Sequence, residues 1–160
     1  MSGTQTLLTI LGLILFSLLA INVNKSIINS SSQTDASEYI ATATTIGQSV
    51  LNMVGSKSFD QGTIGNPTYN ANLLTPANAL GPETGETPAT YNDVDDYNNF
   101  ADADTTPRAG IFNILVRVNY VDDNNPGSII NTVSRTKRIQ VAVKSAFMKD
   151  TLFMYSYKSY

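Results

Sequence analysis

The chain has 160 residues and a formal net charge of −3, and it contains no cysteine and no histidine. This composition excludes thiol nucleophiles, disulfide bonds, histidine general bases and metal sites built from Cys and His. The chain has no excess of positive charge, which argues against nucleic-acid binding. At this length we expect one compact domain plus an extended element.

An apolar run, LLTILGLILFSLLAI, extends from Leu7 to Ile21 within a stretch that carries no charge before Lys25. The run makes about 22 Å of helix, and the flanking Ser, Thr and Gln residues are tolerated in lipid when they are hydrogen-bonded. We therefore expect a single-pass membrane segment. A cleaved signal peptide is the alternative, but the stretch lacks its positive flank and a convincing small-residue cleavage site.

A helical pattern continues after the apolar run. Apolar residues recur at spacings of three and four at Ala36, Tyr39, Ile40, Ala43, Ile46, Gly47, Val50, Leu51 and Val54. The first 57 residues contain no proline, and Gly55 is a helix stop signal. We predict one helix over residues 1–55, with a hydrophobic half at 1–24 and an amphipathic half at 25–55. Residues 29–33, NSSSQ, form its expected weak point.

The predicted helix is about 80 Å long at 1.5 Å per residue. A domain of roughly 100 residues cannot bury a helix of that length. Its N-terminal half must therefore pack against lipid or against copies of itself.

Residues 56–110 are rich in Asn, Asp, Thr, Gly and Pro, and they are predicted to form a long variable loop with short pieces of structure. The loop region is acidic: residues 58–107 carry eight acids and no base, whereas residues 108–160 carry eight bases and three acids. A loop of this length is uncommon in a compact domain and is usually functional or interfacial.

Residues 111–160 show strand patterns. One face of the first strand is formed by Phe112, Ile114, Val116, Val118 and Tyr120. A turn at DDNNPG, residues 122–127, precedes strands expected at 129–133, in TKRIQVAVKS, and in the tail, where Phe153, Tyr155 and Tyr157 share a face. We predict an α+β fold in which the amphipathic half of the helix covers a three- to four-stranded antiparallel sheet.

The order of helix, variable loop and sheet resembles that of type IV pilins and pilin-like proteins. The stretch MSGTQTLLTILGLILFSLLA is similar to a mature pilin N-terminus, with Met1 as the residue left after leader cleavage. YNDVDDYNNF, residues 91–100, is similar to the DDxDDY-type stretch of minor pilins of the mannose-sensitive haemagglutinin kind. The pair FNILVRVNYVDDN and TKRIQVAVKS is similar to the strand pair of those proteins and of some type II secretion pseudopilins.

The resemblance implies a non-enzymatic structural subunit of an extracellular, bacterial pilus-like filament with a role in adhesion and without a cofactor. Its partners would be copies of itself, the inner membrane before assembly, a prepilin peptidase and an assembly machinery. The implied assembly residues are Met1, Gln5, Leu7, Leu8, Ile10, Leu11, Leu13, Ile14, Leu15, Phe16, Leu18 and Leu19. Pilins usually carry a glutamate where this chain has Gln5, which can hydrogen-bond but cannot form an ion pair.

Two other functions remain as alternatives. A membrane-anchored minor pilin or secretion-system pseudopilin would share this layout without forming long filaments. A membrane-tethered hydrolase acting through carboxylates would need one carboxylate in an apolar pocket, and the sequence near the acidic loop does not indicate such a pocket.

The densest group of potential ligands is Asp93, Asp95 and Asp96, followed by Asp102 and Asp104. Closely spaced carboxylate and Asn oxygens suit Ca²⁺, although the spacing differs from that of an EF-hand loop. The same residues would also serve as turn caps in a solvated loop, or as a charged contact between subunits.

Three bases, Arg135, Lys137 and Arg138, are predicted to form a basic edge on the sheet. Charges on an exposed edge prevent unwanted strand pairing. Alternatively, these bases meet Asp93, Asp95 and Asp96 of the next subunit, because head-to-tail contacts between complementary patches generate open helices.

Overall fold

The structure is a computed structural model that describes residues 2–65 and 70–160. Within these ranges it contains one α-helix, three one-turn 3₁₀ helices and a five-stranded antiparallel sheet. The fold class is therefore α+β, as predicted, with more strands than expected. The chain divides into two compact units, Met1–Glu38 and Tyr39–Tyr160.

The helix α1 extends from Gly3 to Gly55, so its predicted end is confirmed. It is helical through residues 29–33, where a weak point was expected. The Thr34 hydroxyl donates to the carbonyl of Ser30 at 2.9 Å. This polar side chain therefore bonds within the helix and does not replace the backbone hydrogen bonds of the helix. At the C-terminal end, Lys158 Nζ donates to the Gly55 carbonyl at 2.9 Å and satisfies an acceptor that has no partner within the helix.

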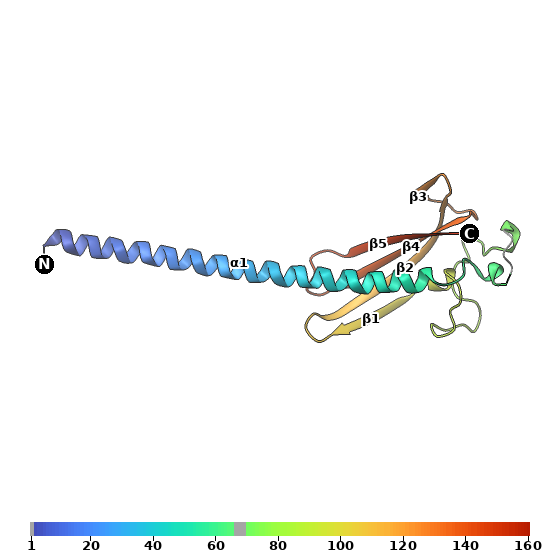
Figure 1. Cartoon of the computed structure of the whole chain (residues 1–160), viewed down its shortest axis with the longest axis horizontal. Helices are drawn as coiled ribbons and strands as arrows, with labels where there is room; N and C mark the ends of the chain where they lie inside the picture. The colour runs from blue at the N-terminus through green and yellow to red at the C-terminus, as the bar shows by residue number, and fades with distance from the viewer. Residues whose placement is uncertain (1, 66–69) are drawn as a thin grey trace. The chain divides into compact units, whose positions relative to one another are not determined.

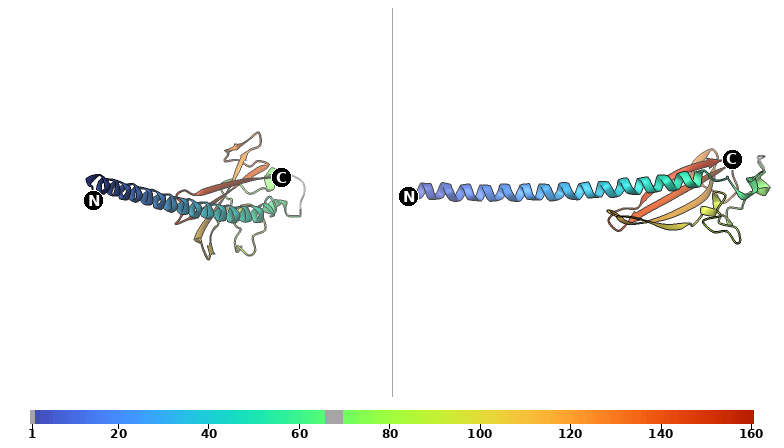
Figure 2. Two further views of the ribbon diagram at one scale, coloured as in Figure 1. Left: turned by 60° about the vertical axis from the view of Figure 1, so that its left-hand side comes forward. Right: turned by 60° about the horizontal axis from the view of Figure 1, so that its bottom comes forward.

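In the unit Tyr39–Tyr160, the last turns of α1 cover one face of the sheet (Figures 1 and 2), as the amphipathic pattern predicts. Four buried residues of these turns belong to one core cluster with the inward side chains of the sheet. They are Ala43, Ile46, Leu51 and Val54. Two members of the predicted apolar stripe, Ala36 and Ile40, lie outside this core and are exposed. The contact with the sheet thus begins close to Tyr39, which packs partly against the core.

The strands are β1 (Ala101–Thr106), β2 (Gly110–Asp122), β3 (Asn125–Ile129), β4 (Thr136–Ser145) and β5 (Leu152–Ser159). They are arranged in the order β1-β2-β4-β5, and β3 pairs with the end of β2 (Figure 1). Three consecutive pairs, β1–β2, β2–β3 and β4–β5, are antiparallel neighbours joined by short turns, whereas β4 pairs with β2 and not with β3.

Two strand boundaries differ from the prediction. The acidic sequence ADADTT forms β1 in a region expected to be loop, because its backbone pairs along β2 from Ala101↔Leu115 to Thr106↔Gly110. The turn after β2 is also shorter than expected. Asp122 Oδ1 accepts the amides of Asn124 and Asn125 at 2.7 and 3.1 Å, and β3 begins at once, so the strand expected at 129–133 is wrong.

The predicted alternation along the long strands is confirmed. All five predicted inward residues of β2 are buried, and on β4 Ile139, Val141 and Val143 are fully buried. On β5 the aromatic residues Phe153, Tyr155 and Tyr157 share the exposed face, while the alternate positions are partly buried.

At Gly47, α1 and the sheet lie so close together that a larger side chain would not fit without a shift. A Cβ added there would lie 2.6 Å from Met154 Sδ and 3.4 Å from Val143 Cγ2. We expect Gly47→Leu to destabilise the fold by about 1–3 kcal/mol through overpacking. The measurement is thermal unfolding of the full chain in detergent, followed by circular dichroism.

The matched control is Gln48→Leu, which places the same side chain at the adjacent exposed position. Its effect should stay within about 0.5 kcal/mol. Equal losses for the two variants would contradict the close packing at Gly47.

Candidate functional site

The first candidate site is the apolar segment of α1, residues 7–23. Its large apolar side chains are each more than half exposed: Leu7, Leu8, Ile10, Leu11, Leu13, Ile14, Leu15, Phe16, Leu18, Leu19, Ile21 and Val23. By length and composition α1 is able to cross a membrane, a property that signal sequences and buried helices share. All ten predicted assembly residues from Leu7 to Leu19 therefore lie on the surface of this unit.

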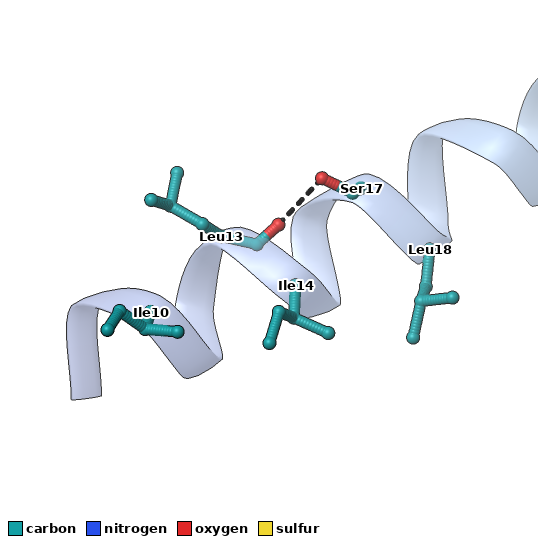
Figure 3. A pocket seen from close by; sticks show the side chains of 5 residues that line it. All are labelled: Ile10, Leu13, Ile14, Ser17 and Leu18. Carbon is teal, nitrogen blue, oxygen red and sulfur yellow. Dashed lines mark hydrogen bonds between the residues drawn. The ribbon is translucent and has the colours of Figure 1, made fainter. Parts of the chain in front are cut away.

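Polar side chains in and beside the apolar segment are satisfied by the helix itself. Thr9 Oγ1 donates to the Gln5 carbonyl at 2.5 Å, and Ser17 Oγ donates to the Leu13 carbonyl at 2.8 Å. In Figure 3 the Ser17 hydroxyl bonds along the helix, while Ile10, Ile14 and Leu18 project together on another side. These bonds remove the main cost of placing hydroxyl groups in an apolar surrounding.

Gln5 lies in the first turn of α1. Its Oε1 accepts the backbone amide of Ser2 at 3.3 Å, and its own amide donates to the Ser2 carbonyl at 2.9 Å. The side chain thus acts locally at a helix end, where backbone amides lack partners within the helix. Met1, also predicted to act in assembly, lies outside the described residues.

The second candidate site is a buried ion cluster around Lys137. Lys137 Nζ lies 2.7 Å from Asp60 Oδ2 and 2.8 Å from Asp95 Oδ1, and all three side chains are fully buried. The ammonium also donates to the Phe59 carbonyl at 2.9 Å. It lies 4.6 and 5.1 Å from the ring centroids of Phe59 and Tyr120, an arrangement that favours a cation.

Asp60 is the most heavily hydrogen-bonded member of the ion cluster. It accepts the amide of Gly62 at 3.1 Å, the amide of Thr75 at 3.0 Å and the hydroxyl of Tyr120 at 3.2 Å. Burial acts to raise the pKa of Asp60, but Lys137 and the two amides outweigh burial and lower it. The carboxylate therefore stays ionised beside its cation.

Asp93 extends the ion cluster without adding charge. Its Oδ1 accepts the amides of Asp95 and Asp96 at 2.9 and 3.2 Å, which is the turn-capping role predicted as one alternative. Burial, with the neighbouring carboxyls of Asp95 and Asp96, raises the pKa of Asp93 to about 9. Asp93 therefore holds its proton at neutral pH.

The structure corrects the predicted inter-subunit charges. Asp93, Asp95 and Asp96 are at most 1% exposed, so the expected solvated loop and the expected contact with another subunit are both wrong for them. The prediction that Lys137 belongs to a basic edge is also wrong. Its strand, β4, lies between β2 and β5, and the Lys137 side chain is buried on the inner face of this strand. The clue was alternation, which places Lys137 on the same side as Ile139, Val141 and Val143.

The other two predicted bases lie nearer the surface. Arg138 is on the outer face of β4, with its guanidinium 5.4 Å from the Tyr155 ring centroid. Arg135 is exposed just before β4, and its amide donates to Asp123 Oδ2 at 3.3 Å. Asp102 and Asp104 are exposed on β1 and take no part in the ion cluster.

A separate group of acids lies in the loop before β1. One carboxylate oxygen from each of Glu83, Glu86 and Asp96 lies within 4.8 Å of the others. Of the predicted calcium candidate, Asp96 belongs to this group, while Asp93 Oδ1 caps the turn and Asp95 Oδ1 accepts from Lys137. Burial and the neighbouring Glu86 raise the pKa of Glu83 to about 7. Sequence gave no signal for the two glutamates, which come close to Asp96 only through the loop conformation.

Comparison with protein families, with curated proteins and with solved structures finds no match for this chain.

We expect the free energy of unfolding to fall strongly when the cation of the ion cluster is removed. Lys137→Met would leave the carboxylates of Asp60 and Asp95 buried without a counter-ion. We expect a loss of about 3–5 kcal/mol in the free energy of unfolding. Unfolding by denaturant, followed through the signal of the sheet, measures it, with the exposed Lys149→Met as the charge-matched control. A difference between the two variants below about 1 kcal/mol would show that the cluster contributes little.

We expect the lowered pKa of Asp60 to make the stability of the fold sensitive to acid. Because its pKa is lower in the folded chain than its ordinary value of 3.8, it contributes stability above that value, and this stability is lost as the pH falls through the folded pKa. Asp60→Asn should therefore show a smaller fall in melting temperature than the parent chain between pH 5 and pH 2. Asp150→Asn, an exposed control, should behave like the parent chain. Parallel curves for all three proteins would refute this assignment.

Proposed function

We propose that this chain is the structural subunit of an extracellular type IV pilus-like filament that is held in a membrane before assembly. The observation that supports the proposal is the exposed apolar segment on a helix whose later turns help to form the core of a sheet domain. Fully burying a Leu, Ile, Val or Phe side chain is worth about 1.5–3 kcal/mol. Twelve such side chains on one segment therefore require lipid or other apolar helices around them.

Two successive surroundings satisfy this requirement. A bilayer accepts the segment because its hydroxyl groups bond to the helix backbone and the stretch from Ser2 to Asn24 carries no charged side chain. A bundle of the same segments from many copies accepts it for the same reason, since apolar helices pack closely with one another. In the proposed filament the segments form the centre, and the units Tyr39–Tyr160 form the outer wall.

The proposed assembly route needs further partners. A prepilin peptidase would process the N-terminus, and an assembly machinery would draw subunits out of the membrane. No group at the site calls for a cofactor in this mechanism, because the driving force is burial of apolar surface.

The second candidate is a membrane-anchored minor pilin or pseudopilin that does not form long filaments. Gln5 favours it, because a neutral side chain that accepts the Ser2 amide gives no ion pair to guide a neighbouring subunit. Electron microscopy of native material distinguishes the two candidates, since long filaments composed of this chain would exclude the second.

Deletion of residues 1–24 tests the filament proposal. We expect a soluble monomer that forms no filament, because the apolar segment is removed while the core residues Ala43 to Val54 remain. Size-exclusion chromatography and electron microscopy measure both properties, and circular dichroism verifies that the sheet is retained. Filaments that persist after the deletion would overturn the proposal.

A further inference from the structure

The acidic group in the loop before β1 contains buried oxygens that have no hydrogen-bond donor among the described residues. Asp96 is 1% exposed, and its Oδ1 has no hydrogen-bond donor among the described residues. Glu83 Oε2 and the side-chain oxygen of Asn92 are likewise buried atoms without a donor in the described ranges. A buried acceptor without a partner costs about 1–3 kcal/mol, and more when it is charged.

The remaining atoms of the same side chains are held in place by hydrogen bonds. Asp96 Oδ2 accepts the amides of Asn92 and Asp93 at 2.8 and 3.1 Å. Glu86 accepts the Asn92 side-chain amide at 3.1 Å through one oxygen and the Glu83 amide at 3.1 Å through the other. These bonds hold the carboxylates of Asp96 and Glu86 in place, while Asp96 Oδ1 has no donor among the described residues.

The charge of this group is not balanced within the part of the chain that the structure describes. The buried ammonium of Lys137 is committed to Asp60 and Asp95, and no ion pair between described residues reaches Glu83, Glu86 or Asp96. Three carboxyl groups with oxygens within 4.8 Å of one another repel when all three are ionised, and either a shared proton or a bound cation relieves this repulsion.

We propose that Glu83, Glu86, Asn92 and Asp96 form a calcium-binding site. Ca²⁺ takes six to eight oxygen ligands at about 2.3–2.6 Å, so two oxygens on opposite sides of one ion are separated by roughly 4.6–5.2 Å. The separation within 4.8 Å fits this size. Mg²⁺ usually keeps several waters and binds through one or two carboxylates, which fits three carboxylates and an amide oxygen less well.

The site lies outside the apolar segment and does not depend on the proposed filament function. Bound calcium would tie residues 83–86 to residues 92–96, the segment that also supplies Asp95 to Lys137. The ion would thus stabilise the conformation of the long loop around Asp95.

Calcium titration of the full chain in detergent tests the site. We expect isothermal titration to detect one Ca²⁺ per chain with a dissociation constant on the order of 10⁻⁴–10⁻³ M, the range of extracellular modules. Addition of CaCl₂ at ten times this constant should raise the melting temperature. MgCl₂ should bind at least tenfold more weakly, and equal affinity for the two ions would contradict the assignment to calcium.

Three variants locate the site. Glu83→Gln and Glu86→Gln, whose side chains are only partly buried, should each weaken Ca²⁺ binding at least tenfold, as should Asp96→Asn. Asp104→Asn, an exposed acid on β1, removes the same charge and should leave the affinity unchanged. Circular dichroism without calcium verifies that each variant is folded, and the two glutamine variants decide the test if Asp96→Asn unfolds.

Two results would overturn the proposal. One is the absence of Ca²⁺ binding by the folded chain at 10 mM CaCl₂, and the other is binding that Glu83→Gln and Glu86→Gln leave unchanged. Neither result would affect the filament proposal, which depends on the apolar segment and is measured by electron microscopy of the deletion variant.

Discussion

The fold of the unit Tyr39–Tyr160 depends on the burial of one ammonium group. Lys137 projects from a central strand into the interior, where an unpaired charge would be too costly to retain. Two carboxylates, Asp60 and Asp95, arrive from loop segments 77 and 42 residues away in sequence. Because both must reach the same nitrogen, a long polar loop acquires a defined position against the sheet. The aromatic residues Phe59 and Tyr120 then close over the ion pair.

The elements that could be predicted from the sequence are those with a periodic apolar pattern. The stripe ending at Val54 and the alternation along β2 each follow from one buried face, so the helix, its end at Gly55 and the long strands were all predictable. Strand β1 was not predictable, because ADADTT carries little β-propensity and depends on pairing with β2. The shorter turn before β3 depends on the Asp122 side chain, whose hydrogen bonds no pattern reveals.

The charged residues mark the limit of sequence reasoning in this chain. Clustered acids and bases suggested surface patches, since charged side chains are rarely buried. The outcome was the opposite for Asp95 and Lys137, because these partners lie far away from each other in sequence. Asp93 is buried as well, where it caps the local turn through the amides of Asp95 and Asp96. Alternation along β4 alone indicated that Lys137 faces inward. The position of the apolar segment was predictable in full, because an uncharged apolar run needs no tertiary information to be recognised.

The ion cluster has a consequence for a chain without cysteine. A contact between Asp60 and Lys137 closes a long stretch of chain, as a cross-link between two thiols does in many small exported domains. This non-covalent closure forms without an oxidant or a disulfide isomerase and is indifferent to reducing agents. The contact between Asp60 and Lys137 is therefore the same in oxidising and in reducing surroundings.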